Sequence, residues 1–148
     1  MARPQYYLLD TNIVLHLIRA SPVALEVQAR YGLNTILAEG LISIVTVGEV
    51  MSFARQRGWQ ADRIARVRER LASLHTIPIE NDDILEAYAA IDTASHATGR
   101  DVGKNDLWIA ATARALNIPL LTTDKDFDHL HPSWIAREWV DPTPPPTV

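Results

Sequence analysis

Three short apolar runs, each followed within a few residues by an acid, alternate with longer helical patterns along this chain. The runs are residues 6–9, 41–45 and 120–122, and the acids that follow them are Asp10, Glu49 and Asp124. Runs of this length without polar alternation are typical of strands that are buried on both faces. Strands that alternate with helices form a parallel sheet covered by helices. The sequence therefore predicts an α/β fold: one domain with a central parallel sheet flanked by helices on both faces.

Helix signals fill most of the chain between these runs. The predicted helices are residues 22–31, 47–57, 60–74, 82–98 and 106–116. The second and third of them form a helical hairpin at about 47–74, because Gly58 separates them. The last is apolar nearly all round, which indicates a helix buried against the sheet. Residues 76–79 fit a short strand at a sheet edge, because Pro78 has no N–H to donate.

Composition narrows the classes of protein that the chain can belong to. It contains no cysteine, which excludes disulfides, zinc–thiolate sites and a cysteine nucleophile. A net charge of −4 argues against coating nucleic acid by bulk charge, although it leaves room for a local basic surface. No apolar run approaches the roughly 20 residues that cross a bilayer, and the first residues lack the apolar core of a signal peptide. We therefore expect a cytoplasmic protein without membrane contact, folded over residues 1–140 and followed by a proline-rich tail at 141–148.

The acids after the runs predict a metal site. Asp106 adds a fourth acid, in the first turn of the predicted helix 106–116. Ligands bind where the carboxyl ends of parallel strands meet, so we expect Asp10, Glu49, Asp106 and Asp124 to converge there. Carboxylates gathered in one place repel each other unless a cation lies between them. An all-oxygen ligand set suits Mg²⁺ or Mn²⁺ better than zinc, and phosphodiester hydrolysis is the natural use of such a site.

Four motifs surround these acids in order along the chain. They are LLDTNI at residues 8–13, TVGEV at 46–50, NDLWIAATA at 105–113 and LTTDKDF at 121–127. Together they resemble the PIN domain, and specifically a VapC-type toxin, over residues 6 to about 137. Trp108 departs from the aliphatic residue that is more common at its position, which concerns packing and not the acids.

The resemblance implies a metal-dependent endoribonuclease, the toxin of a toxin–antitoxin pair, which hydrolyses RNA phosphodiester bonds with a metal-activated water. It implies catalytic roles for Asp10, Glu49, Asp106 and Asp124, with Mg²⁺ (or Mn²⁺) held by Asp10, Asp106 and Asp124. Asp126 is a further candidate ligand. Accessory polar positions match Thr11, Asn12, Thr46 and Thr122. The implied partners are an RNA substrate, a cognate antitoxin protein and a second copy in a homodimer.

Three alternatives stay open. A haloacid-dehalogenase-like phosphatase also carries an aspartate after its first strand, but it needs a second acid two residues later, where this chain has Asn12. A receiver-like module needs a lysine after a late strand, and Lys125 is badly placed for that role. A PIN-like scaffold could bind RNA or protein without cutting.

Half of the chain's arginines lie in the predicted hairpin. They are Arg55, Arg57, Arg63, Arg66, Arg68 and Arg70. Between Arg55 and Arg70, only Asp62 and Glu69 oppose them. This is either a solvated helix face or a surface that follows RNA phosphates beside the acidic site. The apolar side of the hairpin could hold an antitoxin helix.

Overall fold

A five-stranded parallel sheet forms the centre of the molecule. The computed structural model describes residues 5–33 and 35–143. The strands are β1 (Gln5–Leu9), β2 (Ala38–Ser43), β3 (His75–Ile77), β4 (Leu120–Thr122) and β5 (Arg137–Trp139). They lie in the order β3-β2-β1-β4-β5, and each neighbouring pair is parallel. The predicted α/β fold with a central parallel sheet is confirmed.

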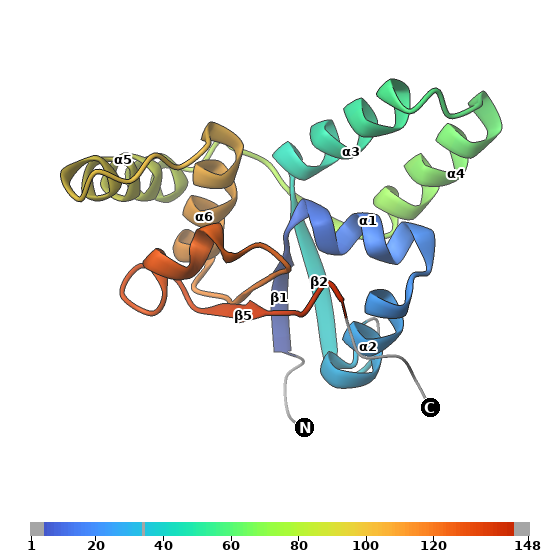
Figure 1. The fold of residues 1–148 in the computed structure, drawn as a ribbon, viewed down its shortest axis with the longest axis horizontal. Coiled ribbons are helices and arrows are strands. Elements are labelled where there is room, and N and C mark those ends of the chain that lie inside the picture. Colours follow the sequence, from blue (N-terminus) through green and yellow to red (C-terminus); the bar gives the residue numbers. More distant parts are fainter. Residues whose placement is uncertain (1–4, 34, 144–148) are drawn as a thin grey trace.

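Helices cover both faces of this sheet. They are α1 (Thr11–Arg19), α2 (Pro22–Tyr31), α3 (Ile44–Gln56), α4 (Ala61–Ala72), α5 (Asp82–Ala97), α6 (Lys104–Leu116) and the 3₁₀ helix η1 (Lys125–Leu130). Figure 1 shows α5 and α6 on one side of β1 and β2, with α1, α3 and α4 on the other. The predicted hairpin is present, since α3 and α4 run as an antiparallel pair.

The core divides according to the alternation of side chains along the central strand. Leu9 packs with Val14, Val50 and Val67 from the helices of one face. Its neighbour Leu8 points to the opposite face and packs with residues of α5 and α6. Both leucines are fully buried. The two-sided burial explains why the sequence of β1 shows a continuous apolar run at its end.

One sequence prediction about local structure is wrong, and some elements were not predicted. The strand predicted over residues 41–45 ends at Ser43, and Ile44 and Val45 already belong to α3. The Ser43 hydroxyl accepts a hydrogen bond from the Val45 N–H at 3.1 Å, so it caps the helix at that point. The 3₁₀ helix η1 and strand β5 were not predicted.

The chain beyond β5 leaves the sheet. The Val140 N–H donates to the Thr122 carbonyl at 2.8 Å, which continues the pairing of the last strand by one residue. Most of the predicted proline-rich tail, residues 144–148, lies outside the described residues. Among the described residues, no helix is long and apolar enough to span a membrane.

Candidate active site

The strand order brings the predicted acids to one edge of the sheet. From β1 the chain first builds β2 and β3 on one side, and it later places β4 and β5 on the other. The crevice between the carboxyl ends of β1 and β4 is therefore the topological switch point, where ligands bind in open α/β sheets. Asp10 directly follows β1, and Asp124 follows β4.

Asp10 is the buried acid of the site, with only 3% of its surface exposed. Its carboxylate caps α1 by accepting the Thr11 N–H at 2.8 Å, and its other oxygen accepts the Thr122 hydroxyl at 2.7 Å. Burial raises the pKa of Asp10 to about 6, and the negative charges of Asp124 and Glu49 add to the rise. The two hydrogen bonds act in the opposite direction and fix the orientation of the side chain.

Three further carboxylates gather beside it. Asp106, in the first turn of α6, and Asp124 and Asp126, at the start of η1, each place an oxygen within 4.8 Å of the others. Burial raises the pKa of Asp106 to about 7, and the negative charge of Asp10 is the next largest cause. The Asp124 carboxylate accepts the Asp126 N–H at 2.8 Å, which holds these two acids at a fixed spacing.

Glu49 lies in the second turn of α3, further along the same edge. The Thr11 hydroxyl donates to one of its oxygens at 2.6 Å, and the Asn105 amide donates to the other at 3.3 Å. The Thr46 hydroxyl lies 3.1 Å from that of Thr11. These hydrogen bonds connect Glu49 to α1 and α6, so polar side chains link the N-terminal parts of α1, α3 and α6.

The structure thus places the four predicted acids at one edge, but it divides them. Asp106 and Asp124 share the close cluster with Asp126, and Asp10 lies beside that cluster. Each oxygen of Asp10 accepts one hydrogen bond, which leaves lone pairs on both oxygens for a metal. From the sequence, Asp126 is only a further candidate ligand. The signal for it was its position two residues after Asp124, in the turn that follows β4.

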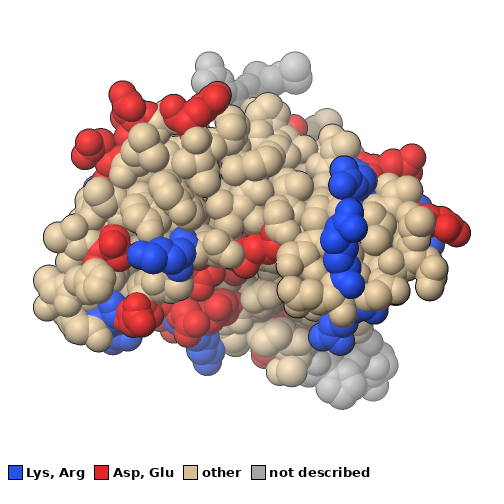
Figure 2. Space-filling view, turned by 90° about the horizontal axis from the view of Figure 1, so that it is seen from above, with Lys and Arg blue, Asp and Glu red and all other residues tan. Residues whose placement is uncertain are grey.

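A divalent cation fits these residues. All the candidate ligands are carboxylate oxygens, which Mg²⁺ and Mn²⁺ prefer. Burial, and after it the neighbouring carboxylates, raise the pKa values of Asp10 and Asp106, so a cation at this place would favour the ionised form of both. In the view from above, acidic side chains gather in the hollow at the middle of this face, between the half that carries α5 and α6 and the half that carries α3 and α4 (Figure 2).

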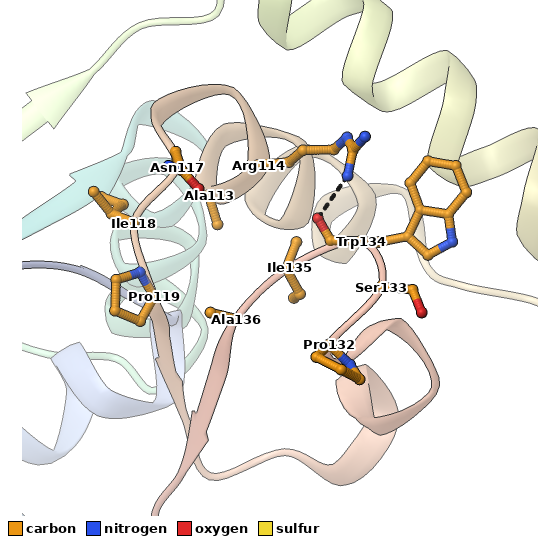
Figure 3. Close-up of a pocket in the computed structure, with 10 residues that line it drawn as sticks. All are labelled: Ala113, Arg114, Asn117, Ile118, Pro119, Pro132, Ser133, Trp134, Ile135 and Ala136. Carbon is orange, nitrogen blue, oxygen red and sulfur yellow. Dashed lines mark hydrogen bonds between the residues drawn. The ribbon is translucent and has the colours of Figure 1, made fainter.

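A separate cavity of about 490 Å³ lies at the opposite edge of the sheet. It is lined by the end of α6, by Pro119 before β4 and by the loop before β5 (Figure 3). Its charged residue, Arg114, donates to the Trp134 carbonyl at 2.9 Å and lies over the Trp134 ring. No acid lines this cavity, so it is distinct from the acidic site.

Comparison with known families agrees with this geometry. The family model described as "PIN domain" matches residues 7–131. The chain belongs to the PIN domain family. The match includes every acid of the site, from Asp10 to Asp126.

The relatives of this PIN domain include proteins named as ribonucleases. Over 129 residues it is 32% identical to ribonuclease VapC1 of Haemophilus influenzae strain R2866, covering 84% of this chain and 91% of that protein. Among solved structures, VapBC-1 from nontypeable Haemophilus influenzae superposes with a TM-score of 0.71 at 26% identity, over 91% of this chain and 98% of that one. VapBC2 from Rickettsia felis, bound to a promoter DNA fragment, gives a TM-score of 0.75 at 24% identity, over 93% and 100% of the two chains.

Proposed function

We propose that this protein is a divalent-metal-dependent endoribonuclease and the toxin of a toxin–antitoxin pair. The observation that carries the proposal is the acidic site itself. Buried Asp10 and the cluster of Asp106, Asp124 and Asp126 meet at the switch point of a PIN domain. The 32% identity to a VapC ribonuclease over most of both chains supports the same activity.

The chain's own residues have separable roles in this proposal. Asp10, Asp106 and Asp124 would hold the metal, and Asp126 is a further ligand because its oxygen lies within 4.8 Å of those of Asp106 and Asp124. Asp10 adds the buried negative charge that draws a cation into the site, and Thr122 fixes its direction. Glu49, held by Thr11 and Asn105, completes the catalytic set. A bound Mg²⁺ or Mn²⁺ supplies Lewis acidity, which lowers the pKa of water and stabilises charge on the phosphate.

The partners in this proposal are an RNA substrate, a cognate antitoxin and a second copy of the chain. Support for the antitoxin comes from the similar chains, which were solved as VapBC complexes. A cytoplasmic location agrees with an RNA substrate. The PIN domain in this proposal is residues 1–140, and residues 141–148 are a tail outside it.

Cleavage of total cellular RNA by the purified protein tests the proposal directly. New RNA ends are mapped by sequencing with Mg²⁺ or Mn²⁺, with a chelator, and with the Asp106→Asn variant. The matched control is Asp83→Asn, which changes an exposed acid in the first turn of α5. We expect discrete cuts with wild-type and Asp83→Asn protein and none in the other two conditions.

A folded, antitoxin-free protein that makes no cuts would contradict the activity and favour a non-cleaving scaffold. Cuts that survive both the chelator and Asp106→Asn would contradict the assigned site. Comparing Mg²⁺ with Mn²⁺ in the same assay identifies the cation that supports cleavage.

A further inference from the structure

A groove leads away from the acidic site along α3. It has a volume of about 500 Å³, and its lining includes Gly48, Glu49, Ser52, Phe53, Gln56 and Asn105. Glu49 and Asn105 form a hydrogen bond with each other and belong to the acidic site, so the groove begins at that site. The remaining residues follow one face of the helix towards its C-terminal end.

Gly48 forms an open part of this groove. It lies inside α3, where glycine weakens a helix because of its conformational freedom. A Cβ at this position would meet nothing within 4 Å, so no protein neighbour requires the glycine. Bare backbone at such a place permits close approach by a ligand.

Three arginines lie over aromatic rings next to this groove. The guanidinium groups of Arg19 and Arg57 lie 5.0 and 4.9 Å from the centre of the Phe53 ring, and that of Arg63 lies 3.7 Å from the centre of Trp59. The two rings contact each other edge to face at 5.8 Å. We call these five residues the arginine–aromatic cluster. Because Phe53 also lines the groove, the cluster is continuous with it.

The arginines of this cluster form no ion pair with another described residue. Among the described residues, the ion pairs are His96–Asp92 and Arg137–Asp128, and neither involves the cluster. Its three arginines are exposed. What distinguishes these arginines from others on a solvated helix face is that each guanidinium lies over an aromatic ring. The contact with the ring restrains each guanidinium and leaves N–H groups free for an anion.

We propose that the α3 groove and the arginine–aromatic cluster bind single-stranded RNA on one side of the cut bond, with the arginines contacting its phosphates. This inference rests on the proposed ribonuclease function. Arg57, the C-cap residue of α3, lies eight residues after Glu49, a rise of about 12 Å, so it reaches phosphates a short way along the strand. Figure 2 shows basic side chains in a stripe on the α3–α4 half of the face whose middle is acidic.

The observations favour RNA over a protein partner at this surface. The acidic site repels a phosphate chain, and a nearby cationic surface offsets that repulsion. The rings of Phe53 and Trp59 are covered by arginines, so they offer little bare apolar area to a partner helix. Phosphate contacts of this kind supply affinity without sequence readout.

The test measures RNA binding without cleavage. A fluorescein-labelled single-stranded RNA of mixed sequence is titrated with protein in the presence of a chelator, and fluorescence anisotropy gives the affinity at a series of salt concentrations. The variants are Arg57→Gln and Arg63→Gln. The matched control is Arg30→Gln, because Arg30 also lies over an aromatic ring, at 5.2 Å from the centre of Tyr31, but on α2.

We expect each test variant to bind more weakly and to reduce the slope of log affinity against log salt by roughly 0.7, the value for one lost phosphate contact on a single strand. Arg30→Gln should keep the wild-type slope. Test variants that bind like the wild type would overturn the proposal and leave the surface to a protein partner. An equal loss with Arg30→Gln would also overturn it, because net charge alone would explain the effect.

A second variant tests the groove without removing charge. Gly48→Leu fills the open space and improves helix propensity, so the protein should fold. We expect weaker RNA binding with an unchanged salt slope, and unchanged affinity would overturn the role of the groove. Binding is measured with chelator, so a failure of metal-dependent cleavage would leave these results intact and would count only against the proposed function.

Discussion

Replacing Asp10 by asparagine should stabilise the metal-free protein at high pH. The carboxyl is 3% exposed, and burial raises its pKa from the ordinary value of 3.8 to about 6. Asparagine has the same shape and can still accept the Thr11 N–H, but it carries no charge to desolvate. The variant therefore removes the cost of burying a carboxylate while it keeps the cap of α1.

The size of the effect follows from the shift in pKa. The folded protein holds this proton more tightly than the unfolded chain, so its stability is highest below the unfolded pKa and falls as pH rises towards the folded one. A rise from 3.8 to about 6 corresponds to a loss of about 3 kcal/mol, complete above the folded pKa. In a chain of this size, that is roughly 6–12 °C in Tm.

Thermal unfolding of wild-type and Asp10→Asn protein, with chelator at pH 4 and pH 8, measures this difference. We expect similar stability at pH 4 and a more stable variant at pH 8, with Mg²⁺ narrowing the gap by stabilising the wild type. Asp83→Asn, at an exposed position, should match the wild type at both pH values. The same offset at pH 4 and pH 8 would refute the reasoning, because the effect would then not depend on ionisation.

Three further substitutions test the site and the sheet. Thr122→Val removes the hydroxyl that donates to Asp10 and should lower the free energy of unfolding by about 1–3 kcal/mol in denaturant titrations. An unchanged free energy of unfolding would mean that this hydrogen bond contributes no net stability. Asp126→Asn should weaken Mg²⁺ binding, measured by calorimetry, about tenfold or more. The control Asp128→Asn should leave Mg²⁺ binding unchanged, and equal effects of the two variants would contradict the assignment of Asp126 to the metal-binding cluster. Gly40→Ala should cost about 1–3 kcal/mol, because its Cβ would lie 2.8 Å from a buried leucine; a protein of wild-type Tm would contradict that clash.

The sequence predicted best the elements whose signals are local. Strand β1 combines an apolar run with Asp10 as the helix cap that follows it, and α5 begins at Asn81, whose side chain accepts the Asp83 N–H at 2.7 Å. The acids could be placed at one edge because each follows a strand or begins a helix. Parallel strands then bring those positions together, whatever the details of packing.

The rest depended on tertiary contacts. Ile44 and Val45 extend the apolar run of β2, and only the Ser43 cap shows that the chain has turned into a helix. Strand β5 is three residues long and half-buried at the sheet edge, so its sequence carries no strong pattern. The inclusion of Asp126 in the cluster follows from the tight turn at the start of η1, where Asp124 accepts its N–H.

The acids of the site lie at the N-termini of helices, and the partial positive charges of these N-termini compensate the negative charge of the carboxylates only in part. Asp10 caps α1, Asp106 lies in the first turn of α6 and Asp124 caps η1, so the partial positive charges of these N-termini face the carboxylates. Even so, the pKa values of Asp10 and Asp106 stay raised, to about 6 and about 7. Burial is the largest cause of both shifts and repulsion between the acids adds to it, so the helix N-termini offset only part of the cost of ionising these carboxyls. A divalent cation is the simplest species that supplies the remainder, and its binding would convert a destabilising group of charges into the centre that holds α1, α6 and η1 together.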